Sequence, residues 1–230
     1  ISPENPNSLS VDGVMFDKEK TVLMAYPAGK TATSYTVPSE VVEICYNAFT
    51  DAKNLKEVVF PNTLTGIGGS AFSGCSDLAT AAIPASVQYI HSDAFLGTAL
   101  TSVTLNNNIA AINPYTFSGT NLMSIKVPES VTTIMYGAFA NCESLADIQL
   151  PKTLMSVDSS AFDNTAWYNA QANGPTYLSH IAYNYKGDMP EDTTIDIQDG
   201  ITTTANSAFG WQQNLTAVTF PMTMKNVAYE

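Results

Sequence analysis

Apolar residues recur along this chain with a fixed period of 22 or 23 residues. Phenylalanine marks the period most clearly, and six of its seven periodic copies follow an alanine, whereas one follows Thr116. These copies are Phe49, Phe72, Phe95, Phe117, Phe139, Phe162 and Phe209. A repeat of this length indicates one supersecondary coil per unit, which buries its apolar face only against neighbouring coils. The pattern therefore predicts an elongated solenoid.

The first half of each unit has the pattern of a short strand. Val58 and Phe60 lie two residues apart, so they point to one face of a strand while Val59 points to the other. Pro61 then ends the ladder, because proline has no amide hydrogen to donate. One parallel strand per coil is expected, at residues 56–60, 79–83, 101–105, 123–127, 146–150 and 216–220.

The second half of each unit predicts a short extended piece followed by a turn. A second short extended piece is expected from Leu64 to Ile67, and the segment from Ser70 to Cys75 suits a single helical turn. The seven phenylalanines are expected to form one continuous buried column. The 22-residue units have a Gly–Thr corner at Gly97 or Gly119, so length varies at a turn, where solenoids tolerate it.

The repeat resembles the BspA-like, or Treponema-type, subclass of leucine-rich repeats, whose frame is L-x-x-I-x-[LF]-P-x-[ST]-[LV]-x-x-I-x-x-x-A-F-x-x-C. Residues 55–75 and 122–142 match this frame nearly position for position, and the resemblance covers residues 35–167 and 195–230. It implies a leucine-rich-repeat solenoid, a right-handed superhelix that is mainly β, with short parallel strands and short helical turns. Such repeats occur in many secreted and surface proteins, mainly bacterial, and adhesion is the role best known for the family.

Two segments depart from the repeat. Residues 9–27 contain Asp12-Gly13 between apolar runs, which is a strong hairpin signal. Residues 168–194 interrupt the array and mirror the first segment, with Ser179-His180 at the turn. Both are predicted to be β-hairpins that project from the solenoid. A degenerate extra coil is the alternative for the second, because its excess length is close to one period.

Composition and charge narrow the class of protein. The chain carries 9 basic and 21 acidic residues, which gives a net charge of −12. This balance argues against nucleic acid, which requires clustered Lys and Arg. No run of 18 apolar residues is present, so membrane insertion is not expected. We expect one repeat domain over residues 1–230, cut from a longer exported protein, because neither Ile1 nor Glu230 lies in a capping unit.

Reactive side chains are scarce. His91 and His180 have no Cys, Asp or Glu at a recurring metal-ligand spacing, and no nucleophile, zinc or phosphate-loop motif is present. The sequence thus predicts no enzyme, no cofactor and no transition metal. Acidic residues gather between 188 and 199, where a solvated loop is expected and a calcium site is the alternative.

The three cysteines are expected to be buried free thiols. Cys75 and Cys142 share one position of the repeat but lie three coils apart, too far for a disulfide. Cys45 belongs to a different position of the repeat.

Two candidate surfaces for protein partners follow from the register. The first is the outward side of the strands, where Lys126 is the only basic residue, and its alternative is a solvated sheet face. The second is the aromatic group around the insertion, which packs the hairpin onto the solenoid or anchors a partner. The candidate residues are Glu57, Thr104, Lys126, Asp147, Gln149, Tyr177, Tyr183 and Tyr185.

The rigid repetitive surface without reactive groups predicts a non-enzymatic recognition module, and the resemblance adds adhesion to protein partners at the cell surface or in secreted form. Two alternatives remain from other classes. One is a structural spacer that binds nothing, which the small polar strand face favours. The other is an accessory domain of a surface enzyme, for example one that processes glycans.

Overall fold

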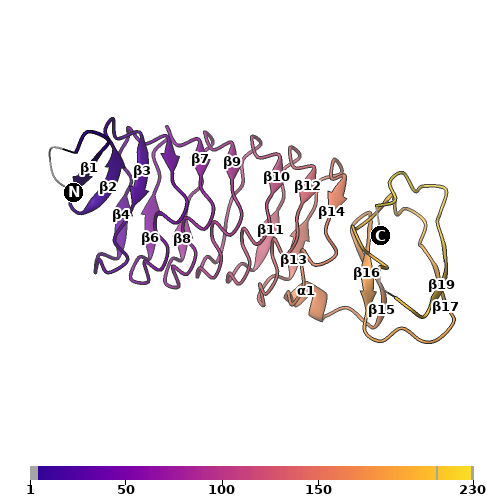
Figure 1. The fold of residues 1–230 in the computed structure, drawn as a ribbon. Coiled ribbons are helices and arrows are strands. Elements are labelled where there is room, and N and C mark those ends of the chain that lie inside the picture. Colours follow the sequence, from indigo (N-terminus) through magenta and orange to yellow (C-terminus); the bar gives the residue numbers. More distant parts are fainter. Residues whose placement is uncertain (1–4, 211, 229–230) are drawn as a thin grey trace.

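The computed structural model describes residues 5–210 and 212–228, which form one row of stacked coils (Figure 1). Ile1 and Glu230, on which the expectation about capping units rests, lie outside these ranges. Most coils carry two short strands and not one, because the extended piece after the proline turn also pairs with its neighbours. The strands therefore form two columns along the solenoid (Figure 1).

The first column contains five of the six strands predicted above, together with two more at 34–36 and 193–196. Its members are β4 (Ser34–Thr36), β6 (Glu57–Val59), β8 (Thr80–Ala81), β11 (Ser124–Lys126), β13 (Asp147–Gln149), β17 (Thr193–Asp196) and β19 (Leu215–Thr219). Pairing within this column is parallel, as expected, and Ser34 pairs with Glu57, which in turn pairs with Thr80. The register of the strands thus repeats the period of the sequence.

The second column follows the turn that ends each first strand. Its members are β5 (Glu43–Ile44), β7 (Gly66–Ile67), β9 (Tyr89–Ile90), β10 (Ala111–Ile112), β12 (Thr133–Ile134), β14 (Ser156–Val157) and β18 (Thr203–Thr204). In five of these strands the second residue is an isoleucine that points into the core, whereas β14 has the buried Val157 and β18 the buried Thr204 at that place. Ile44, Ile67 and Ile90 are all at most 3% exposed.

The prediction of a strand at 101–105 is wrong. Residues 101–105 join no ladder, so the first column splits into β4–β6–β8 and β11–β13. The second column splits between β9 and β10, although β10 still pairs with β12. Asparagine side chains bridge the break: Asn106 Nδ2 donates to the Pro84 and Val87 carbonyls at 2.9 and 3.0 Å, and Asn113 Nδ2 donates to the Ile90 carbonyl at 2.7 Å. These side chains link the two coils where the ladders are interrupted, whereas at the corner the backbones pair directly, as the Phe95 N–H does with the Thr116 carbonyl at 2.9 Å.

The prediction of a helical turn around each phenylalanine is also wrong. Ser70 and Gly74, on either side of Ala71-Phe72, have φ of 53° and 71°, whereas a helix needs φ near −60°. Most other coils repeat this pair of left-handed residues, and polar or glycine residues fill most of these positions because they tolerate the conformation. In the described part of the chain the only helix is α1 (Ala166–Asn169).

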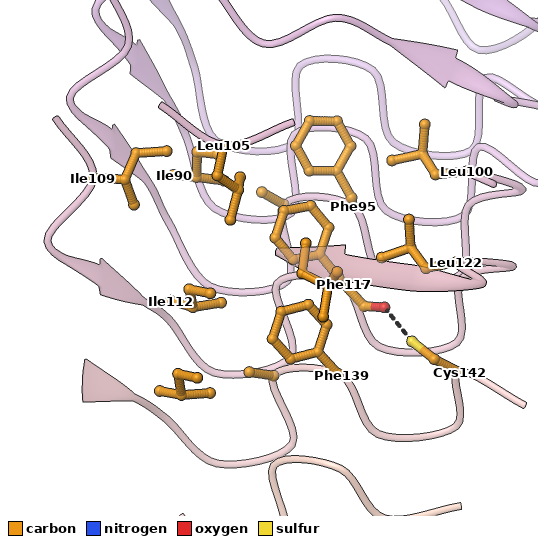
Figure 2. Packing of buried hydrophobic residues seen from close by; sticks show 14 of the residues in the cluster. Ile90, Phe95, Leu100, Leu105, Ile109, Ile112, Phe117, Leu122, Phe139 and Cys142 are labelled. Atoms are coloured by element: carbon orange, nitrogen blue, oxygen red, sulfur yellow. Dashed lines mark hydrogen bonds between the residues drawn. The ribbon is translucent and has the colours of Figure 1, made fainter. Parts of the chain in front are cut away.

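A column of aromatic rings runs through the core. All seven periodic phenylalanines are buried, and those from Phe49 to Phe162 stack coil on coil with ring centroids 4.7 to 5.7 Å apart. Figure 2 shows Phe95, Phe117 and Phe139 in this stack, with Cys142 Sγ donating to the Phe117 carbonyl at 3.0 Å. The predicted column is confirmed over these six coils. Beyond Phe162 the next ring is that of Tyr183, at 5.9 Å.

The two irregular segments both form antiparallel hairpins. Near the amino end, β1 (Ser8–Val11), β2 (Val14–Asp17) and β3 (Val22–Ala25) pair in sequence, and β3 continues in parallel to β5. Within residues 168–194, β15 (Gly174–Leu178) and β16 (Ile181–Lys186) pair, and β16 continues in parallel to β18. The inner strand of each hairpin therefore joins the second column.

Candidate binding surfaces

The outward side chains of the first column, here called the strand face, lie in the order that the repeat predicts. Glu57, Thr104, Lys126, Asp147 and Gln149 are all exposed. The structure brings three of them together, because Lys126 pairs with Gln149 across β11 and β13, and Gln149 Nε2 donates to Asp147 Oδ2 at 3.2 Å. Glu57 belongs to the separate sheet that contains β6, and Thr104 lies in the coil between the two sheets.

The break in the ladder hollows the strand face. A pocket of about 500 Å³, here called the break pocket, is lined by Thr104, Lys126, Glu129 and neighbouring residues. A second pocket of about 220 Å³ lies on the other side of the same coil, against residues 80–83. Within the described residues, the backbone groups of 101–105 form no hydrogen bond to other backbone groups. Unpaired main-chain donors and acceptors thus line an exposed face.

The tyrosines of the inserted hairpin differ in burial. The prediction that Tyr183 contacts a partner is wrong. Tyr183 is fully buried, its hydroxyl accepts a hydrogen bond from the Phe162 N–H at 2.8 Å, and its ring lies 5.4 Å from that of Trp167. Burial raises the pKa of Tyr183 well above its ordinary value. Tyr177 and Tyr185 are half-buried against the core, so each keeps an accessible edge.

Trp167 and Tyr168 complete this aromatic group by packing around Tyr183. Lys186 fixes their position, because its ammonium donates to the carbonyls of Tyr168, Asn169 and Gln171 at 2.7 to 3.0 Å. Most of the aromatic surface around the insertion therefore packs the hairpin onto the solenoid.

Groups that could perform chemistry are not brought together. Among the described residues, no cluster of three or more His, Cys, Asp or Glu side chains is placed to hold a metal ion, and this includes the acidic residues of 188–199. His91 is exposed beside Tyr89, with ring centroids 5.1 Å apart. Across the same ranges, no helix is long and apolar enough to cross a membrane.

The cysteines are free thiols, as the sequence predicts, but only two are buried. Burial raises the pKa of Cys75 to about 12 and also raises that of Cys142, so both stay protonated and unreactive at neutral pH. Cys45 is half-buried, which corrects the expectation for that residue. It follows Ile44 at the end of β5 and packs against the core with part of its surface exposed.

The sequence analysis missed a set of tyrosines on the second column and the corner after it. Tyr89 lies across Gly66 of the preceding coil, where a Cβ would come within 2.2 Å of the ring, and Tyr115 covers Gly137 of the following coil in the same way, at 2.4 Å. The signal was present in the sequence, because each tyrosine lies one period from its glycine.

Comparison with known proteins identifies the repeat. The family profile described as BspA type leucine rich repeat region matches this chain in 6 copies, over residues 26–146 and 110–230. Among curated proteins, no relative matches.

Solved structures agree on the fold. A leucine-rich repeat protein from Eubacterium ventriosum has 25% identity and a TM-score of 0.61, and the match covers 78% of this chain and 54% of that one. A leucine-rich repeat protein from Bacteroides ovatus has 20% identity and a TM-score of 0.52, with 98% of this chain and 70% of that one covered. The chain thus spans about half the length of the first of these structures.

Proposed function

Because the chain belongs to the BspA-type leucine-rich repeat family, we propose that it is a non-enzymatic recognition module that binds protein partners at the cell surface or in secreted form. The observation that carries this proposal is the break in the strand face at residues 101–105. Exposed main-chain groups there are a template for an extended segment of another protein, which can pair with them as an added strand. The break pocket, at about 500 Å³, gives room for side chains of that segment.

The charges on the strand face favour a partner that places a carboxylate next to Lys126. Lys126 lines the break pocket, and within the described residues it forms no salt bridge. Its ammonium is therefore available to a carboxylate of a partner, while Glu129 and Asp147 nearby disfavour acidic segments that are placed differently. Charges at the rim of an interface mainly set the association rate and its salt dependence.

A structural spacer is the second candidate. Six stacked phenylalanine rings and small polar outward residues suit a rigid rod that displays a distant domain. The two functions differ in one respect that can be measured, since a spacer has no partner of its own.

The test is direct binding of the purified chain to a panel of purified extracellular-matrix proteins, measured by biolayer interferometry. Recognition through the strand face predicts that Lys126→Glu slows association with at least one partner and that the difference shrinks at high salt. Lys53→Glu, the same charge change at the corner outside the break pocket, serves as the matched control and leaves association unchanged. No binding to any member of the panel favours the spacer.

The inserted hairpin is tested by point substitutions and not by its deletion, because removing 168–194 also removes the buried Tyr183. Tyr177→Ala together with Tyr185→Ala removes only half-buried rings. If that double variant loses binding while Lys126→Glu keeps it, the binding element is the hairpin and the strand face is inert.

A further inference from the structure

A small pocket opens at the corner between the coils that contain Phe117, Phe139 and Phe162. Its volume is about 210 Å³, and it lies apart from the break pocket, with which it shares no lining residue. The side chains that form it are those of Tyr115, Tyr136, Asn141, Ser160, Asp163 and Asn164. We call it the corner pocket. Nothing in the proposed recognition of proteins by the strand face accounts for it.

One wall of the corner pocket rests on a strained residue. Tyr115 has a φ of 53°, in the left-handed region that bulky side chains rarely adopt. The equivalent residues of the preceding coils are Asn47, Ser70 and Asp93, which tolerate this conformation more easily. Strained backbone of this kind concentrates at binding sites, where the surrounding structure holds it in place. A tyrosine here is unfavourable for the coil alone, so it indicates a use for the ring.

The aromatic wall is fixed by its neighbours. The Tyr115 ring covers Gly137, where any Cβ would come within 2.4 Å of Tyr115 Cε1, so a larger residue would displace the ring. Tyr136 meets Tyr115 edge to face, with centroids 5.1 Å apart and an interplanar angle of 87°. Tyr136 remains 52% exposed. The pair therefore presents a preformed aromatic surface to whatever enters the pocket.

The same pocket is lined by polar groups with free hydrogen-bonding capacity. Asn164 Nδ2 donates to Asn141 Oδ1 at 2.9 Å, which orients both amides and leaves the Asn141 amide hydrogens and the Asn164 carbonyl oxygen without a partner among the described residues. The Asp163 carboxylate makes no hydrogen bond or ion pair within the same ranges. Partial burial, together with the charge of Asp158, raises the pKa of Asp163, as expected for a poorly solvated carboxylate.

We propose that the corner pocket binds one ring of a neutral sugar. The apolar C–H face of a pyranose packs on an aromatic ring, while its hydroxyls both donate and accept, which matches the free amide and carboxylate groups of the same pocket. The volume is below the roughly 300 Å³ at which pockets for drug-sized ligands begin, so a single ring fits and a longer chain extends into solvent. Asp158, Asp163 and the net charge of −12 exclude anionic sugars.

The experiment is saturation-transfer difference NMR on the full chain with methyl α-D-mannopyranoside, methyl β-D-galactopyranoside and methyl β-D-glucopyranoside, each at millimolar concentration. We expect transfer to the ring C–H protons of at least one of them. Tyr136→Ala should weaken that binding by at least about fivefold, because it removes the exposed ring of the pair. Asp163→Ala should also weaken it, because it removes the free acceptor.

Tyr46→Ala is the matched control, since Tyr46 is equally an exposed corner tyrosine but lines no part of the corner pocket, and it should leave the signal unchanged. Thermal unfolding checks that each variant is folded. Absence of transfer to all three neutral glycosides overturns the proposal, as does a Tyr136→Ala signal equal to that of the unsubstituted chain. Stronger transfer to methyl β-D-glucuronide than to any neutral glycoside also overturns it.

Discussion

The hydroxyl of Tyr183 replaces a main-chain carbonyl for Phe162. In each preceding coil the phenylalanine N–H donates to the residue before the next phenylalanine, as Phe139 does to the Ala161 carbonyl at 2.8 Å. The coil of Phe209 bridges to the Phe162 coil at Asp158 and Asn206, but the Phe162 N–H donates to Tyr183 Oη, also at 2.8 Å. Tyr183 therefore continues both the column of rings and the row of hydrogen bonds where the repeat is interrupted.

We predict that Tyr183→Phe destabilises the chain by about 1–3 kcal/mol. The substitution keeps the ring but leaves the buried N–H of Phe162 without an acceptor, which costs the desolvation free energy of that group. Urea unfolding gives the measurement. Tyr185→Phe, which removes the hydroxyl of a half-buried tyrosine on the same strand, should change the free energy of unfolding by less than about 0.5 kcal/mol. Equal effects of the two substitutions would show that the hydrogen bond is not structural.

Truncating a phenylalanine at the centre of the ring column should lower the free energy of unfolding more than Tyr183→Phe does. Phe117 lies between Phe95 and Phe139, with centroids 5.7 and 5.6 Å away, and it is 1% exposed. Phe117→Ala removes contacts on both sides and leaves a cavity, so the free energy of unfolding should fall by about 3–5 kcal/mol. Phe220→Ala, at a side chain that is 41% exposed, is the control and should cost far less.

Because Asn106 links two coils and Asn107 does not, substituting them should change the free energy of unfolding by different amounts. Asn106→Ala removes the donor to the Pro84 and Val87 carbonyls, and we expect a loss of about 1–3 kcal/mol in thermal or urea unfolding. Asn107 is exposed and forms no side-chain hydrogen bond within the described residues, so Asn107→Ala should be within about 0.5 kcal/mol of the unsubstituted chain. A similar loss in both variants would contradict the assignment of Asn106 as the bridge between the coils.

Alkaline pH should weaken the fold in part through Cys75. Its thiol has a pKa of 9.0 when solvated and about 12 in the folded chain, so the folded state holds the proton more tightly than the unfolded state. The stability that this difference contributes is complete below pH 9 and is lost as the pH rises towards 12. At about pH 10.5 the loss from this group is on the order of 1–2 kcal/mol.

The measurement is urea unfolding at neutral and alkaline pH for the unsubstituted chain and for Cys75→Ala. Buried tyrosines such as Tyr183 contribute in the same direction in both proteins, because their pKa is also raised. The variant should therefore lose less stability between the two pH values, even though it starts from a lower value. An identical loss in the two proteins would exclude the Cys75 thiol as a cause.

The repeat itself could be predicted from the sequence because its signal is local and is repeated many times. The spacing of phenylalanines fixes which residues are buried, and burial in stacked coils fixes parallel pairing at one period, as the pairs Glu57–Thr80 and Lys126–Gln149 show. The positions of exposed residues on the strand face follow from the same alternation. The family could be recognised for the same reason.

Only the tertiary structure decided where the repeat departs from itself. The asparagine link beside the break at 101–105 and the role of Tyr183 each depend on one side chain that meets a backbone from another coil. Such contacts are set by distances between coils, which no local pattern encodes. The candidate binding surfaces lie at these departures, because a regular coil satisfies its own backbone and only an irregular one leaves groups free for a partner.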